Sequence, residues 1–279
     1  MELLDLEPLI DRAIMEDIGK GDLTTTLCLT QNPVVEAQII ANESGIIAGI
    51  EIAELVFKKI NKKVKFEKKI EGGKRIKKGD VVASIKGNAQ DILSTERVAL
   101  NFLQHLSGIA TLTSKFVEAV KPYKAKIYDT RKTLPTLRAI EKYAVRTGGG
   151  NNHRFGLYDG ILIKDNHIGI VGGITQAVKQ VQQNLTTDMK VEVETKNLDE
   201  VKEAVDINVD IIMLDNMSLE MILEAVKIIK ASKKDILIEV SGGVSLENVN
   251  EIASTGVDII SIGALTHSAK ALDLSLEIK

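Results

Sequence analysis

Residues that can bind an anion or stabilise a positive charge lie at or just after the ends of six short apolar runs in this 279-residue sequence. In chain order they are Thr130, Arg131 and Lys132; Lys164; Glu194; Asp215; Ser241, Gly242 and Gly243; and Gly263. In a parallel α/β barrel the carboxyl ends of the strands meet on one rim, and the loops that follow them carry the chemistry. If the six runs are such strands, the sequence predicts one site that combines cations, two carboxylates and glycine-rich loops.

Arg131 and Lys132 precede a predicted helix over residues 135–147. Thr133 can cap this helix, and Pro135 suits its first turn. Cations at the positive end of a helix dipole are each unfavourable by roughly 0.3–1 kcal/mol. An ion pair with a neighbouring carboxylate could offset one of the two charges, but hardly both. The sequence therefore predicts an anionic ligand at this helix start.

The loops after the last two runs are predicted to bind phosphate. Ser241-Gly242-Gly243 and Gly263 each lead into a helical segment, where backbone N–H groups and a helix N-terminus can hold an anion. Glycine lets the backbone approach such a ligand closely. His267, one turn into the last helix, can donate a further hydrogen bond.

The stretch GGGNNHR, residues 148–154, brings an imidazole and a guanidinium together in one loop. Its glycines predict a tight loop, while His153 and Arg154 are suited to recognise a carboxylate. Together with the other cations of the rim, they predict a ligand with several anionic groups. Glu194 and Asp215 would then serve a metal ion or a developing positive charge. A metal-free sugar-phosphate aldolase is disfavoured, because its Schiff-base lysine would have fewer guanidinium neighbours.

The elements that must position these residues are six predicted strands, at 125–129, 160–165, 191–195, 211–215, 236–242 and 259–263. The last four begin 20, 25 and 23 residues apart, a spacing that suits strand–helix units. Such units predict a parallel α/β barrel, incomplete with six strands, although an open doubly wound sheet would have the same periodicity. Before residue 110 the pattern predicts an amphipathic helix from Leu3 to Asp17, a strand, a second helix, and hairpins over residues 64–85. The final residues, ALDLSLEIK, predict a strand that returns to this first region.

The composition is that of an ordinary globular protein. Apolar residues make up 44% and charged residues 27%, and the net charge of -3 gives no general attraction to nucleic acid or to an anionic membrane. Lysines gather over residues 58–78, but interleaved acids and scarce aromatics favour solvated surface over a nucleic-acid patch. The single Cys28, with no signal-peptide or membrane-spanning pattern, predicts a soluble cytoplasmic protein.

Four longer segments are distinctive, namely TRKTLPTLRAIEKYAV, GGGNNHRFGLYDGILIKDNHI, MLDN and SIGALTHSAKALDLSL. Together they resemble the quinolinate phosphoribosyltransferase family, and the similarity runs over almost the whole sequence. The resemblance implies an N-terminal α/β sandwich, residues 1–112 completed by 271–279, and a C-terminal open α/β barrel, residues 113–270. It also implies a homodimer or hexamer with active sites shared between subunits.

The same resemblance implies the reaction. A phosphoribosyl group would pass from phosphoribosyl pyrophosphate to quinolinate, with Mg²⁺ and with decarboxylation. The products would be nicotinate mononucleotide, pyrophosphate and CO₂, as a step of NAD synthesis. A relative of the same fold with a different substrate is the closest alternative, and the complete set of rim cations argues against it.

The family likeness assigns a role to each predicted site residue. The quinolinate pocket would be formed by Thr130, Arg131, Lys132, His153, Arg154 and Lys164, together with Arg97 of the partner subunit. Glu194 and Asp215 would hold the ribose hydroxyls and Mg²⁺, directly or through water, and with Lys132 would take part in catalysis. The phosphate would bind at Ser241, Gly242, Gly243, Gly263 and His267.

Four further positions carry smaller expectations. Thr136 stands where the family usually has glycine, which affects the backbone at the start of the helix. Arg138, one helical turn past the Arg-Lys pair, could reach the edge of the pocket. His105 is expected to be packed or at an interface, and His167 to be structural or to support a residue of the site.

Overall fold

The computed structural model describes residues 6–279, and the chain divides into two compact units. Unit 1 comprises residues up to Ser114, Ala139–Gly149 and Ala269–Lys279, and unit 2 comprises Lys115–Arg138 and Gly150–Ser268. The helix predicted from Leu3 begins at Glu7, and the first part of that prediction lies outside the described residues. The domain boundaries at 112 and 270 stay a prediction.

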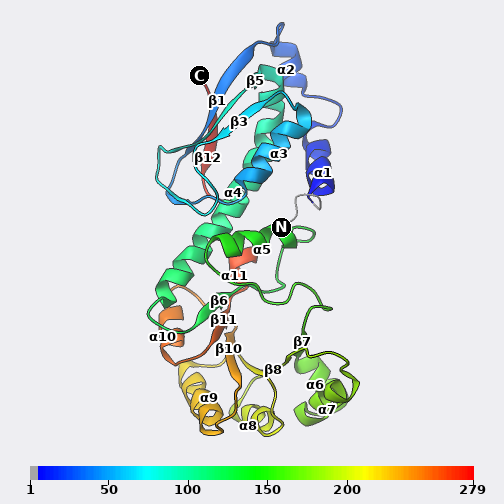
Figure 1. The fold of residues 1–279 in the computed structure, drawn as a ribbon, viewed down its shortest axis with the longest axis vertical. Helices are drawn as coiled ribbons and strands as arrows, with labels where there is room; N and C mark the ends of the chain where they lie inside the picture. The colour runs from blue at the N-terminus through cyan, green and yellow to red at the C-terminus, as the bar shows by residue number, and fades with distance from the viewer. Residues whose placement is uncertain (1–5) are drawn as a thin grey trace. The chain divides into compact units, whose positions relative to one another are not determined.

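Unit 1 is a mixed region of helices and antiparallel strands (Figure 1). Its elements are α1 (Glu7–Ile18), α2 (Leu23–Cys28), β1 (Val34–Ala41), β2 (Gly45–Ile46), α3 (Ile50–Ile60), β3 (Lys65–Lys68), β4 (Arg75–Ile76), β5 (Val81–Asn88), most of α4 (Ala89–Val120), α5 (Arg138–Thr147) and β12 (Leu274–Ile278). The main sheet has the order β12-β1-β5-β3, and β2 pairs with β4. Along β1 every second residue from Ala37 to Ala41 is buried, as expected for a sheet that covers a core with one face.

The last strand of the chain pairs with the first. In an antiparallel register, Ala37 faces Ile278 and Ala41 faces Leu274. The C-terminal segment therefore belongs to the sheet of unit 1.

Unit 2 is built from strands that alternate with helices. They are β6 (Lys126–Tyr128), β7 (Ile161–Ile163), α6 (Asp165–Val171), α7 (Ile174–Asn184), β8 (Val191–Thr195), α8 (Leu198–Asp206), β9 (Ile211–Asp215), α9 (Leu219–Ala231), β10 (Leu237–Ser241), α10 (Val249–Ser254), β11 (Ile259–Ser261) and α11 (Ala264–His267). All six strands are parallel, and the six predicted runs are confirmed as strands, with β8 and β9 at the predicted bounds.

The order of the six strands distinguishes an open barrel from a doubly wound sheet. The sheet runs β6-β11-β10-β9-β8-β7, so the first strand lies beside the last and the others follow in chain order. This is the cyclic order of a barrel, with β6 and β7 left as its two edges. A doubly wound sheet would instead reverse its order at a switch point. The predicted incomplete α/β barrel is confirmed.

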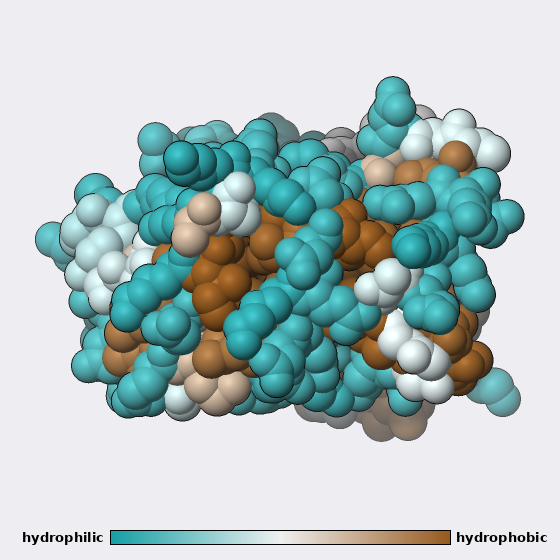
Figure 2. Space-filling view, turned by 90° about the horizontal axis from the view of Figure 1, so that it is seen from below, coloured by the Kyte–Doolittle hydropathy of each residue, from teal (hydrophilic) through white to brown (hydrophobic). Residues whose placement is uncertain are grey.

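Both faces of this sheet are covered. All five residues of β8 are buried, and α8 and α9 lie outside the strands (Figure 1). Because side chains alternate along a strand, Glu192 and Glu194 lie on one face and the valines of β8 on the other. The outer face packs on helices such as α8, which buries Val201, Ala204 and Val205. In the view of Figure 2, from below, hydrophobic residues show between a larger number of hydrophilic ones.

The helix predicted over residues 135–147 begins three residues late. Its start is Arg138, because Thr136 has φ 68°, a left-handed conformation that no residue inside a right-handed helix adopts. The predicted end at Thr147 is correct, and Gly149 follows with φ 91°. The predicted helix start is therefore wrong: Thr133 and Pro135 lie in the loop before the helix and do not begin it.

Among residues 6–279, no helix combines the length and the apolar character needed to cross a bilayer.

Candidate active site

A cavity of about 510 Å³ opens at the carboxyl ends of the unit 2 strands, where the barrel fold predicts chemistry. Among its lining residues are Thr130, Arg131, Lys132, His153, Arg154, Lys164, Glu194, Asp215, Ser241, Gly242 and Gly243. Residues from six loops and strand ends, up to about 110 positions apart in the sequence, thus share one cavity. The predicted site is brought together, with three exceptions.

The exceptions are Gly263, His267 and Arg97. Gly263 borders the cavity, since a Cβ built on it would lie 3.0 Å from Cδ of Lys132 and 3.2 Å from Nε2 of His267. His267 is exposed, and its Nδ1 lies 2.6 Å from the hydroxyl of Ser268. Arg97 lies on α4, with its side chain 59% exposed, and its role in a partner's site stays a prediction.

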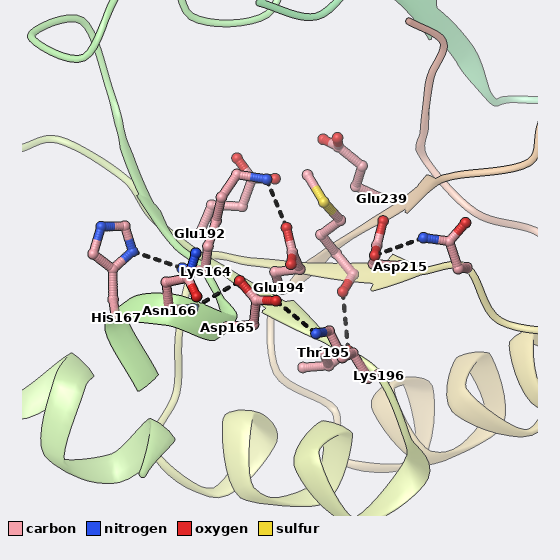
Figure 3. A network of polar contacts seen from close by, with 12 residues as sticks. Lys164, Asp165, Asn166, His167, Glu192, Glu194, Thr195, Lys196, Asp215 and Glu239 are labelled. Atoms are coloured by element: carbon pink, nitrogen blue, oxygen red, sulfur yellow. Dashed lines mark hydrogen bonds and ion pairs between the residues drawn. The ribbon is translucent and has the colours of Figure 1, made fainter. Parts of the chain in front are cut away.

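Glu194 and Asp215 bring two carboxylates to the ends of neighbouring strands (Figure 3). Glu194 pairs with Lys164, with 2.6 Å between Oε2 and Nζ. Asp215 accepts a hydrogen bond of 2.8 Å from the side chain of Asn216. Each carboxylate is therefore oriented by one polar neighbour, and both line the same cavity.

The loop after β6, which carries Arg131 and Lys132, is held in place by hydrogen bonds to its backbone. Thr130 Oγ1 accepts the N–H of Lys132 at 3.0 Å, and Thr266 Oγ1 donates to the carbonyl of Lys132 at 2.7 Å. Arg138 donates to the carbonyl of Arg131 at 3.2 Å. Within the described residues, Nε of Arg131 is buried without a hydrogen-bond partner. A buried guanidinium N–H with no partner is costly, and an anionic ligand would supply one.

The loop that contains His153 and Arg154 is fixed by Asp129, which is fully buried at the end of β6. Asp129 accepts the backbone N–H of His153 at 2.9 Å and a hydrogen bond from the side chain of Asn152. Arg154 donates to the carbonyl of Gly160 at 2.9 Å. Burial, and next the nearby charge of Arg131, lower the pKa of the Arg154 guanidinium. Two guanidinium groups that repel each other in one cavity favour a polyanionic ligand.

His153 lies over two buried carboxylates that the sequence reasoning missed. Its Nε2 is 3.2 Å from Oε2 of Glu192 and 3.6 Å from Oε2 of Glu239. Both glutamates are at least 96% buried, and each has a second oxygen without a hydrogen-bond partner among the described residues. The alternation of strand residues was the available signal. Glu192 precedes Glu194 by two positions, and Glu239 precedes Ser241 by two, so each faces the same way as a predicted site residue.

The charges of this cluster are coupled. Burial alone would lower the pKa of His153, but the two glutamates outweigh it and raise the pKa from 6.5 to about 10. Burial also raises the pKa of Glu192. The N–H of Arg154 lies 2.8 Å from Nδ1, a bond that only the unprotonated nitrogen can accept, so it opposes part of the rise. The upward direction holds, because two nearby carboxylates outweigh one neutral hydrogen bond.

The turn after β10 has the backbone of an anion cradle. Gly242 and Gly243 have φ values of 88° and 63°, in the left-handed region that glycine adopts without strain. Consecutive N–H groups in such turns can converge on a phosphate. The turn lines the same cavity as Asp215, one strand away.

The other singled-out residues lie outside the cavity lining. His105 pairs with the buried Glu141 of α5, 2.8 Å from Nε2 to Oε1, which agrees with a packed histidine. His167 accepts the N–H of Lys164 at 3.0 Å through Nδ1, a structural contact at the start of α6. Arg138 holds the loop after β6, as described above.

Comparison with known proteins agrees with this fold. The families described as "Quinolinate phosphoribosyl transferase, N-terminal domain" and "C-terminal domain" match residues 22–107 and 109–277. A curated relative from Synechocystis, a probable nicotinate-nucleotide pyrophosphorylase (carboxylating), is 44% identical over 273 residues, which cover 98% of this chain and 92% of the relative. A relative of the same description from Bacillus subtilis is 43% identical over 278 residues, which cover 100% of this chain and 95% of the relative.

Solved structures extend the likeness to three dimensions. The crystal structure of nicotinate-nucleotide pyrophosphorylase from Ehrlichia chaffeensis is 42% identical, with a TM-score of 0.94 and coverage of 100% of this chain and 99% of that one. The chain belongs to the quinolinate phosphoribosyltransferase family.

Proposed function

We propose that this protein is a carboxylating nicotinate-nucleotide pyrophosphorylase. It transfers the phosphoribosyl group of phosphoribosyl pyrophosphate to quinolinate and releases pyrophosphate and CO₂. The observation that carries the proposal is the cavity of unit 2, in which four lysine and arginine side chains, the carboxylates of Glu194 and Asp215, and a glycine turn meet in a chain of this family. Quinolinate is a dianion at neutral pH, and phosphoribosyl pyrophosphate adds further anionic groups.

Quinolinate binds among the cations. The guanidinium groups of Arg131 and Arg154 match its carboxylates bidentately, and the ammonium of Lys164 adds a point charge. Support comes from the unpartnered Nε of Arg131 and from the proximity of the two guanidinium groups. In an oligomer, Arg97 of the partner subunit completes this pocket, and the protein is a homodimer or a hexamer.

The carboxylates serve the ribose. The bond from C1′ to the pyrophosphate oxygen breaks, and positive charge develops on C1′ until the ring nitrogen of quinolinate bonds to it. Glu194 and Asp215 stabilise this charge, and such electrostatic contributions are often worth about 2.7–4 kcal/mol per group. Once the ring nitrogen is ribosylated, its positive charge stabilises the electron pair that stays on C2 when the bond between C2 and its carboxylate breaks. CO₂ departs and a proton takes its place.

The phosphate binds at the Ser241-Gly242-Gly243 turn, with Gly263 and His267 beside it. Mg²⁺ is the proposed cofactor. Hard carboxylate oxygens at two neighbouring strand ends fit this ion, which usually takes one or two protein carboxylates together with substrate phosphates. When bound, Mg²⁺ would neutralise charge on the departing pyrophosphate. A cytoplasmic location is proposed from the single Cys28, which suits a reducing compartment.

The test compares wild-type protein with Arg131→Ala, using quinolinate, phosphoribosyl pyrophosphate and Mg²⁺. We expect wild-type turnover and its loss in Arg131→Ala, with an unchanged circular dichroism spectrum. Arg12→Ala, an exposed arginine of α1, is the matched control and keeps full activity. Absence of product with wild-type protein contradicts the function, whereas full activity of Arg131→Ala contradicts only the role of that residue.

A further inference from the structure

Asn216 has an unusual backbone at the edge of the cavity. It follows the last residue of β9 and has φ 53°, in the left-handed region where few side chains other than asparagine are tolerated. Its N–H donates to the carbonyl of Ser241, 2.9 Å away on the neighbouring strand β10. This hydrogen bond joins the end of β9 to the end of β10.

The side chain of Asn216 reaches in two directions. Its Nδ2 donates to Oδ2 of Asp215 at 2.8 Å, the hydrogen bond marked at Asp215 in Figure 3. Its amide also packs against the glycine turn. A Cβ on Gly242 would lie 2.3 Å from Oδ1 of Asn216 and 2.5 Å from its Cγ, closer than any real Cβ contact. Gly242 thus leaves room for this amide as well as adopting a left-handed φ.

We infer that Asn216 is a positioning residue for phosphoribosyl pyrophosphate, whose single side-chain amide fixes Asp215 and the Ser241-Gly242-Gly243 turn relative to each other. This inference rests on the proposed function. Asp215 receives the ribose and the turn receives the phosphate, so the spacing of the two must match one ligand. The backbone bond to Ser241 and the side-chain contact with Gly242 set this spacing across two strands.

The inference predicts a selective effect on one substrate. Within the described residues, Asn216 forms hydrogen bonds with Asp215 and Ser241. It forms none with Lys164, Arg131 or Arg154, the groups assigned to quinolinate. Loss of the amide should lower the affinity for phosphoribosyl pyrophosphate and leave the affinity for quinolinate unchanged. A hydrogen bond to a charged group, together with the packing contact, corresponds to a loss of about tenfold to a hundredfold in affinity.

The first experiment replaces the amide but keeps the backbone. Asn216→Gly tolerates the left-handed φ, so its thermal unfolding midpoint should stay near that of wild-type protein. The matched control is Asn208→Gly. Asn208 also has a left-handed φ, 60°, but lies before β9 at the opposite end of the strand and does not line the cavity. Asn216→Asp is a second variant, which keeps the shape of the side chain and removes the donor.

Dissociation constants for phosphoribosyl pyrophosphate with Mg²⁺ and for quinolinate are measured separately by calorimetry, beside the two KM values. We expect both Asn216 variants to lose about tenfold or more in affinity for phosphoribosyl pyrophosphate, with quinolinate affinity within twofold of wild type. Asn208→Gly should match wild-type protein for both ligands. An unchanged affinity for phosphoribosyl pyrophosphate, or equal weakening of both ligands, overturns the inference.

A double-mutant cycle tests the contact with Gly242. When Asn216 is present, Gly242→Ala should lower the affinity for phosphoribosyl pyrophosphate, because the new Cβ collides with the Asn216 amide. In the Asn216→Gly background that collision is gone, so the same substitution should cost less. If the effects of the two substitutions on the affinity for phosphoribosyl pyrophosphate are additive, the contact between Asn216 and Gly242 does not couple them.

The proposed function can fail separately from this inference. If wild-type protein binds phosphoribosyl pyrophosphate but does not turn over quinolinate, the proposed function is refuted, and the same affinity measurements still test the role of Asn216. Wild-type protein that binds no phosphoribosyl pyrophosphate refutes both.

Discussion

Lys164 and Glu194 form an ion pair inside the cavity, with 2.6 Å between Nζ and Oε2. The glutamate side chain is 8% exposed, whereas that of the lysine is 43% exposed. The pair joins a group assigned to quinolinate with one assigned to the ribose. Glu194 is therefore held by a partner that can remain in water when the pair is broken.

We predict that Glu194→Gln lowers kcat by about 10²- to 10³-fold, the usual effect of removing one group that stabilises charge in a transition state. The fold should persist, because the glutamine carbonyl can still accept a hydrogen bond from Lys164. Steady-state kinetics and circular dichroism measure both. Glu224→Gln, in an exposed pair with Lys227 on α9, is the control and should leave kcat unchanged. Wild-type kcat in Glu194→Gln would refute the role of this carboxylate.

Thr136 is a β-branched residue with φ 68°, which is an outlier for its type. The left-handed conformation costs about 1–2 kcal/mol, and glycine would avoid it while losing about 0.5–1 kcal/mol in chain entropy. Thr136→Gly should therefore raise the free energy of unfolding by roughly 0.5–1 kcal/mol. Urea denaturation measures the change. Thr187 is exposed and does not have a positive φ, so Thr187→Gly should lower the free energy of unfolding. If both substitutions raise it, the argument from backbone strain is contradicted.

His153 gives the protein a pH dependence of known sign. Its pKa is raised from 6.5 to about 10, so its contribution to stability is complete below pH 6.5 and is lost as the pH rises through 10. The raised pKa of Glu192 acts in the same direction, since the folded protein holds that proton longer. Histidine NMR should show no deprotonation of His153 near pH 6.5 in wild-type protein. Glu192→Gln and Glu239→Gln should each lower its pKa, and a wild-type midpoint near 6.5 would contradict the cluster.

The first glycine of the GGGNNHR stretch is needed for packing. A Cβ on Gly148 would lie 2.4 Å from the carbonyl of Ala110 and 2.8 Å from Cβ of Thr113, both on α4. Gly148→Ala should therefore destabilise the protein by about 1–3 kcal/mol. Gly169→Ala in α6 meets no atom within 4 Å, and should stabilise it by up to about 1 kcal/mol. Equal unfolding midpoints for the two variants would refute the packing argument.

The strands were predictable because buried parallel strands have a simple signature. β9 is a short apolar run that ends in Asp215, and β8 alternates valine with glutamate; both agree with the prediction at both ends. Their carboxyl ends meet on one rim in any parallel barrel, so residues such as Glu194 and Asp215 could be assigned to one site before the structure. The start of α5 was not predictable in this way, because Thr136 adopts a backbone that its residue type disfavours.

The two glutamates that contact His153 were not predicted, for a different reason. Glu192 and Glu239 lie inside β8 and β10, before the strand ends, and within each strand only the residues at the end entered the prediction. Their contact with His153 brings together three segments, and no local pattern reports such a contact. Asn216 was visible next to Asp215, but its contact with Gly242 depends on the register of β9 and β10.

The central claim is that this protein couples phosphoribosyl transfer to decarboxylation of quinolinate. The most direct measurement uses quinolinate labelled in its 2-carboxylate, with phosphoribosyl pyrophosphate and Mg²⁺, and nicotinate as a parallel substrate. We predict one labelled CO₂ for each nicotinate mononucleotide formed from quinolinate, and no product from nicotinate. Product that retains the label, or turnover of nicotinate in place of quinolinate, would contradict the claim.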